Sequence, residues 1–158
     1  MRDKRFIAEH QGGPLKKEQH KQLIKWACDC IENVLPLLGE KLDERLKNAL
    51  LIAKDWAKGN ATVGDARNAS LKAIAVANES SNPIEIAVAR AVGHAVATAH
   101  MADHSLGAAL YALKAVKNAG KSIDAERKWQ NEQLPSEIME LVLTTRSKKE
   151  QVFKDLRI

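Results

Sequence analysis

Residues 80–102 read SSNPIEIAVARAVGHAVATAHMA, and this stretch decides the fold class. Asn82 followed by Pro83 is typical of a helix start, because the Asn side chain accepts bonds from unpaired backbone amides and proline suits the first helical position. Glu85 falls in the first turn, where a negative charge is favourable. The stretch therefore predicts an Ala- and Val-rich helix from Pro83 to about Ala102.

Alanine continues on both sides of this stretch: residues 61–119 contain 18 alanines in 59 positions. Alanine favours helix and loses almost no side-chain entropy on folding, but it buries little area. Helices of this composition are stabilised by close backbone packing, in which dispersion contacts take the place of large side chains. We expect them to form a tightly packed, alanine-rich centre.

Helical periodicity extends through the rest of the chain, and no segment alternates polar and apolar residues as a strand would. The first helix is expected to bend or loosen near Leu35, because Pro36 lacks a backbone donor, and to end at Gly39. Gly59 ends the second helix. Thr62 and Asp65 form a capping box for the third. Helices are expected to start near residues 16, 42, 62, 83, 106, 122 and 135. The fourth and fifth could also be one long helix with a bend. The predicted fold is all-α, a compact bundle of six or seven helices with an Ala-rich central core.

The chain has 158 residues, 45% of them hydrophobic, which is typical of one compact domain. The run Gly12-Gly13-Pro14 closes a short amino-terminal arm, residues 1–15. A single helical domain is expected over residues 16–150. Residues 151–158 are expected to form a carboxy-terminal tail or an extension of the last helix.

The net charge of +5 is concentrated at the amino end, where residues 1–25 hold 7 Lys and Arg against 3 Asp and Glu. Nucleic-acid binding would need a basic stripe with aromatic residues or a recognition motif, and neither is apparent. No run of about 18 apolar residues exists, so no membrane span is expected.

Cys28 and Cys30 point about 200° apart on a helix, so a mutual disulfide is unfavourable. Two free thiols fit the cytoplasm.

Charged and imidazole side chains interrupt the most apolar part of the chain. Buried polar groups cost about 1–3 kcal/mol each when unpaired, so these side chains are expected to find partners inside the fold. They would either hold helices in register or form a ligand or partner site. The candidate cluster is Arg90, His94, His100, Asp103 and His104, together with Asp29 and Tyr111.

A metal site is a further interpretation of the same histidines. His100 and His104 are four residues apart and share a face if the helix is continuous. The catalytic Glu of a His-Glu-x-x-His motif is absent. His94 lies about 240° from His100 around a straight helix, so the three rings cannot all meet on one. Asp29 or Asp103 could supply a third ligand. The sequence leaves a divalent transition metal on His100 and His104 as an alternative to no cofactor.

Signals for an enzyme are weak elsewhere. No Gly-rich phosphate loop follows a strand, and a Gly-x-Ser-x-Gly motif is missing. Cys28 or Cys30 could act as a nucleophile only with a histidine that the fold brings near, and a small core-facing thiol is the favoured interpretation of each. The sequence therefore favours a protein that is not an enzyme.

Four blocks of sequence resemble a known family. They are Trp26-Ala27-Cys28-Asp29-Cys30, Val34-Leu35-Pro36-Leu37, residues 93–100 (Gly-His-Ala-Val-Ala-Thr-Ala-His) and Ala108-Ala109-Leu110-Tyr111-Ala112. Together with Arg67, Arg90, Asp103 and His104, they are similar to a bacterial family of putative immunity proteins. The resemblance covers roughly residues 15–145.

The resemblance implies an all-helical cytoplasmic protein of a polymorphic toxin system, which would bind and neutralise a partner toxin by stoichiometric association. It supplies no catalytic residues. The basic charge fits a partner with an acidic surface, or a toxin other than a nuclease, because inhibitors of basic nucleases tend to be acidic. An alternative function is a small-molecule or metal-binding helical protein, enzymes included, that uses the candidate cluster in an interior pocket.

Overall fold

The computed structural model describes the backbone of residues 3–155 and the side chains of residues 3–148. Over this range the chain forms seven α-helices and three short 3-10 helices, with no strand beyond an isolated bridge between Ala8 and Leu15. The α-helices are α1 (Lys17–Glu32), α2 (Glu44–Ala57), α3 (Val63–Glu79), α4 (Pro83–Ala97), α5 (His104–Asn118), α6 (Ile123–Glu132) and α7 (Ser136–Asp155). The 3-10 helices are η1 (Lys4–Phe6), η2 (Glu9–Gln11) and η3 (Leu35–Leu38). The sequence predicts that the first helix continues to Gly39 with a bend, but it ends at Glu32, and Pro36 lies in the first turn of the separate helix η3. The predicted all-α fold is confirmed.

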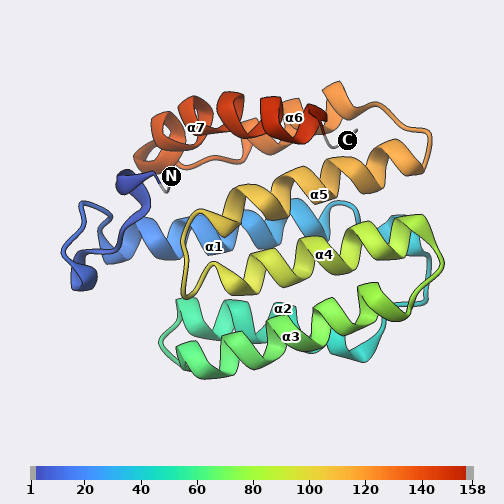
Figure 1. Ribbon diagram of the computed structural model, residues 1–158, viewed down its shortest axis with the longest axis horizontal. Coiled ribbons are helices and arrows are strands. Elements are labelled where there is room, and N and C mark those ends of the chain that lie inside the picture. The colour runs from blue at the N-terminus through green and yellow to red at the C-terminus, as the bar shows by residue number, and fades with distance from the viewer. Residues whose placement is uncertain (1–2, 156–158) are drawn as a thin grey trace.

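Helices α4 and α5 form the centre of the bundle and pack against each other (Figure 1). On one side α3 packs on α4, and α2 packs on α3. On the other side α6 and α7 cover α5, while α1 crosses behind and contacts α2, α4 and α5 (Figure 1). Of the alanine-rich residues 61–119, the part that forms α4 and α5 therefore lies in the middle, while α3 lies to one side of it.

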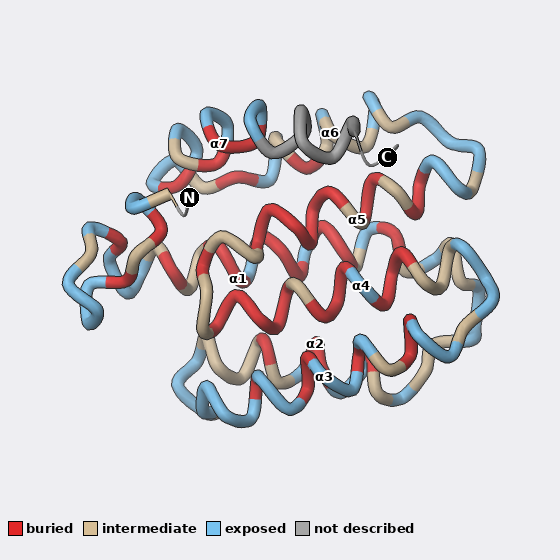
Figure 2. Tube along the Cα trace, viewed as in Figure 1, coloured by how far each residue is buried: buried red, intermediate tan, exposed pale blue. Residues whose placement is uncertain are grey.

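The buried residues run along α1, α4 and α5 (Figure 2). Small side chains dominate there, and the alanines that are 0 or 1% exposed on α4 and α5 are Ala87, Ala89, Ala91, Ala95, Ala108, Ala109, Ala112 and Ala115. Larger side chains form a separate hydrophobic cluster between α1, α5 and α7, which includes Trp26, Leu106 and Ile138. Phe6 and Leu15 of the amino-terminal arm belong to this cluster and are 0 and 2% exposed. The arm is thus packed onto the bundle.

Two helix starts follow the local signals in the sequence. The Oγ1 atom of Thr62 accepts from the Asp65 amide at 3.0 Å, and the Asp65 carboxylate accepts from the Thr62 amide at 2.9 Å. The Asn82 side chain accepts from the amides of Ile84 and Glu85 at 2.9 and 3.3 Å. Both predicted caps are confirmed.

The end of α4 differs from the prediction. The helix ends at Ala97 instead of about Ala102, and α5 begins at His104, so the segment is two helices and not one bent helix. At the break, the Thr98 carbonyl lies 2.5 Å from Nε2 of His20, which reaches it from α1. The Thr98 hydroxyl donates back to the His94 carbonyl at 3.0 Å. The Thr98 carbonyl, at the end of α4, thus has its partner on another helix.

Candidate functional site

A pocket of about 500 Å³ opens between α3, α4 and α5. Its lining combines polar and aromatic side chains with a small apolar floor. The lining residues are Ser70, Ile74 and Asn78 of α3, Arg90, Gly93, His94 and Ala97 of α4, His100 of the connecting loop, and His104 and Tyr111 of α5. We call this the α3–α5 pocket.

The three histidines meet in this pocket because the helix breaks between them. His94 lies in the last turn of α4, His100 in the loop and His104 at the start of α5. The Nδ1 atoms of His94 and His104 lie 3.1 Å apart, and the ring centroids of His100 and His104 lie 5.7 Å apart. A straight helix would have kept His94 and His100 about 240° apart, so the tertiary fold creates the cluster.

Helix α5 positions the His94 ring by means of two residues one turn apart. Tyr111 stacks on His94 with a centroid separation of 5.3 Å and an interplanar angle of 23°. Gly107 lies beside the same ring, and a Cβ atom added there would be 2.6 Å from Nδ1 of His94. Glycine therefore makes room for the imidazole, a role that the sequence analysis missed.

The structure brings together five of the seven candidate residues. Arg90, His94, His100, His104 and Tyr111 all line the α3–α5 pocket. The arginine is exposed, and the histidines and the tyrosine are half-buried. The cluster consequently faces an open pocket at the surface and is not sealed in the interior.

The other two candidates lie outside that lining. Asp103 precedes α5, where its side chain makes no capping hydrogen bond, and its buried Oδ1 atom has no hydrogen-bond partner among the residues described. Asp29 is exposed on α1 and lines a different pocket of about 220 Å³ with Lys25 and Lys54. Asp29 is therefore not a partner of the histidines.

The histidines do not form a metal centre in the arrangement seen. Within residues 3–148, no three side chains of His, Cys, Asp or Glu come together as a group that could hold a metal ion. The facing Nδ1 atoms of His94 and His104 are at a hydrogen-bond distance from each other. Binding of a metal by His100 and His104 stays a prediction.

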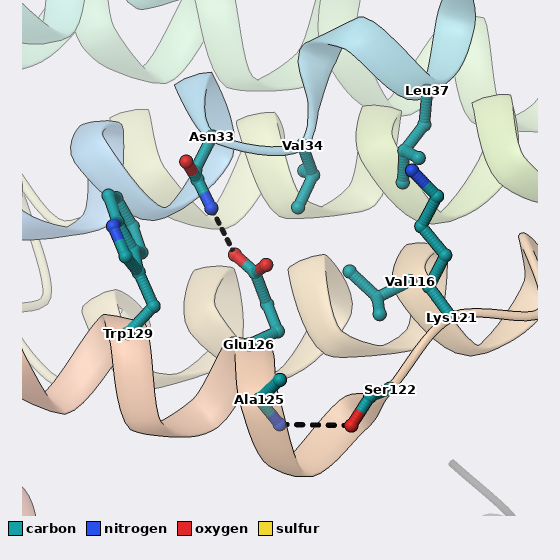
Figure 3. A pocket seen from close by; sticks show the side chains of 9 residues that line it. All are labelled: Asn33, Val34, Leu37, Val116, Lys121, Ser122, Ala125, Glu126 and Trp129. Atoms are coloured by element: carbon teal, nitrogen blue, oxygen red, sulfur yellow. Dashed lines mark hydrogen bonds between the residues drawn. The ribbon is translucent and has the colours of Figure 1, made fainter.

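Another pocket, of about 280 Å³, lies where the carboxyl end of α1 meets α6 (Figure 3). Two hydrogen bonds join residues of its lining: the Asn33 amide donates to the Glu126 carboxylate at 2.7 Å, and the Ser122 hydroxyl accepts from the Ala125 amide at 3.1 Å. Trp129 also lines this pocket (Figure 3). Because these hydrogen bonds serve the helix ends, the α3–α5 pocket is the stronger candidate site.

Comparison with known proteins identifies the family. The family model described as Imm-5 like putative immunity protein matches residues 13–137, which is most of the chain. The chain belongs to this family. No curated protein and no solved structure matches it. Within the described part of the chain, the helices of this Imm-5 like protein are too short or too polar to cross a membrane.

A network of buried polar side chains in this Imm-5 like protein was missed by sequence reasoning. Gln130 of α6 is 0% exposed and donates to the Ala109 carbonyl at 3.1 Å. Its side-chain oxygen accepts from Arg146 of α7, which is 3% exposed. Its backbone carbonyl accepts from the Trp26 indole at 2.8 Å. These bonds tie α1, α5, α6 and α7 together, so the network stabilises the fold and lies away from the α3–α5 pocket.

Both cysteines are expected to be chemically inert in the folded protein. Cys28 and Cys30 are free thiols that are 1 and 0% exposed. Burial raises the pKa of Cys28 to about 12 and raises the pKa of Cys30 well above its usual range. Thiols react as thiolates, and at pH 8 only about 1 in 10⁴ of Cys28 would be ionised.

We expect no release of thionitrobenzoate when the folded protein is treated with a dithionitrobenzoate reagent at pH 8. Two equivalents should be released after unfolding in urea, which serves as the control for two reduced thiols. Rapid release of one equivalent from the folded protein would contradict the structure. It would support the alternative interpretation of Cys28 or Cys30 as a nucleophile.

Proposed function

We propose that this protein binds a partner toxin and neutralises it by stoichiometric association in the cytoplasm. The observation that carries the proposal is membership of the Imm-5 like putative immunity protein family over residues 13–137. Neutralisation by binding requires a rigid scaffold that presents a complementary surface. The closely packed helical bundle supports the first requirement.

The surface beside the α3–α5 pocket supports the second requirement. Leu71 and Ile74 of α3 are 61 and 43% exposed, and Ile74 lines the pocket. Protein interfaces commonly combine an apolar centre with polar groups that fix orientation. The pocket and these two side chains supply both kinds of group on one face.

The test is co-expression with a candidate toxin domain chosen from the genes that neighbour this one in its genome. A bacterial host that expresses the toxin alone should stop growing, and the wild-type protein should restore growth. The two purified proteins should form a complex of fixed stoichiometry in size-exclusion chromatography with light scattering. Growth arrest that persists although both proteins are soluble would argue against neutralisation.

A second candidate function is the binding of a small molecule or a metal ion in the same pocket. Its volume of about 500 Å³ falls within the range of roughly 300–1,000 Å³ typical of ligand sites. Native mass spectrometry of the protein purified from its own host tests this candidate. A bound metabolite or ion at one equivalent, together with no toxin binding, would favour it over neutralisation.

A further inference from the structure

We infer that the α3–α5 pocket receives an acidic side chain, Asp or Glu, from the partner protein. The inference rests on the proposed function and specifies which surface and which chemistry would carry it. Three observations support it: the charge in the pocket, the histidines in its lining, and the exposed apolar side chains beside it.

The lining of the pocket contains one cation and no acidic residue. Arg90 is its one formally charged lining residue at neutral pH, and none of the described lining residues is Asp or Glu. A carboxylate bound there would therefore meet a positive charge and no acidic lining residue. An arginine can also bind a carboxylate through two parallel hydrogen bonds.

Arg90 also differs from other arginines of the protein. Arg5 is paired with Asp3 at 2.7 Å, and Arg45 is paired with Asp43 and Glu79 at 3.0 and 2.7 Å. Among the residues that the structure describes, none forms a hydrogen bond or an ion pair with the Arg90 guanidinium. Its donors are thus available to a group supplied by another molecule.

His94 and His104 both line the pocket, and their rings are hydrogen-bonded to each other. The bond between the Nδ1 atoms of His94 and His104 requires one ring to accept at Nδ1. A neutral imidazole that accepts at one nitrogen carries its proton on the other, here Nε2. At least one of these lining histidines therefore carries its proton on Nε2, and an N–H group of this kind can donate to a carboxylate, as the Arg90 guanidinium can.

An apolar rim would shield such a pair from water. Arg67, Leu71, Ile74 and Asn78 recur at helical spacing on α3, so they form one stripe that leads to the pocket. Leu71 and Ile74 are exposed, and Ile74 lines the pocket together with Arg90, so a partner that covers Ile74 would also exclude water from the pocket mouth. Charge pairs at interfaces contribute most where surrounding contacts exclude water.

The decisive experiment compares Arg90→Glu with Lys128→Glu. Both substitutions exchange an exposed cation for an anion, but Lys128 lies on α6, on the other side of α5 from α3 (Figure 1). Arg90→Glu is expected to raise the dissociation constant for the toxin at least about 30-fold and to abolish growth protection. Lys128→Glu should change the constant less than about 3-fold. Thermal unfolding of both variants checks that each is folded.

A charge exchange then identifies the partner group. Asp and Glu residues of the toxin are changed one at a time to Arg, and one such variant should bind the Arg90→Glu protein more tightly than it binds the wild type. If wild-type protein fails to bind or neutralise the toxin, the proposed function itself is wrong. If it neutralises and Arg90→Glu does so equally well, only the acidic side-chain inference is wrong. Saturable binding of citrate that depends on Arg90, without an effect of Arg90→Glu on toxin binding, would assign the pocket to a small anion and overturn the inference.

Discussion

Replacing Arg146 by alanine is expected to lower the free energy of unfolding by about 3–5 kcal/mol. The Arg146 side chain is 3% exposed, and its guanidinium lies 5.9 Å from the ring centroid of Trp26. It donates to the side chains of Gln130 and Asn131, the latter at 3.0 Å. Alanine would leave a cavity beside Trp26 and would remove the donor to a Gln130 oxygen that is fully buried. Urea unfolding at equilibrium measures the change.

Two further substitutions separate the causes of that loss. Arg146→Met keeps most of the buried stem but removes the hydrogen bonds, so the difference between the Met and Ala variants measures the packing of the stem. Arg90→Ala is the control, because Arg90 is exposed and its loss should change the free energy of unfolding by no more than about 0.5 kcal/mol. Equal effects of Arg146→Ala and Arg90→Ala would contradict the buried network.

Local sequence signals predicted where helices begin but not where α4 ends. Thr62 and Asn82 act on amides two or three residues away, so a short stretch of sequence contains all the information. At the end of α4, the Thr98 carbonyl meets the side chain of His20, which lies 78 residues away in the chain. No local pattern reports such a contact, and the alanines that follow Thr98 favour helix.

The difference between local sequence signals and contacts of distant residues also explains which residues of the pocket the sequence could indicate. Polar residues in an alanine-rich stretch are conspicuous, and this contrast identified Arg90 and the histidines. Gln130 lies in α6, whose sequence IDAERKWQNE is polar almost throughout, so one buried glutamine has no contrast with its neighbours. Its burial is decided by where α5 and α7 pack. The position of Asp29 could not be predicted for a related reason, because only the fold shows that it lines another pocket.

Replacing Gly107 by alanine is expected to destabilise the protein by about 1–3 kcal/mol, because the added Cβ overlaps the His94 ring. Helix propensity alone predicts the opposite sign, since alanine is favoured over glycine by roughly 0.5–1 kcal/mol inside a helix. The overlap is severe, at 2.6 Å from Nδ1 and 2.9 Å from Cγ of the imidazole. Moving the ring away would disturb both its stacking on Tyr111 and its hydrogen bond to His104.

The His94→Ala background should reverse the sign of this effect. Without the ring, the Cβ of Gly107→Ala no longer overlaps an imidazole, and the gain in helix propensity should stabilise the protein by up to about 1 kcal/mol. Gly64→Ala is the matched control: Gly64 is exposed on α3, and its added Cβ would lie 3.6 Å from the nearest atom, the Thr62 hydroxyl oxygen. The effect of Gly64→Ala on the free energy of unfolding should be the same with and without His94. Equilibrium unfolding of the four combinations at each glycine gives both coupling energies. If Gly107→Ala destabilised both backgrounds equally, the glycine would be required by something other than the position of His94, and the α5 packing that positions this ring in the pocket would need another explanation.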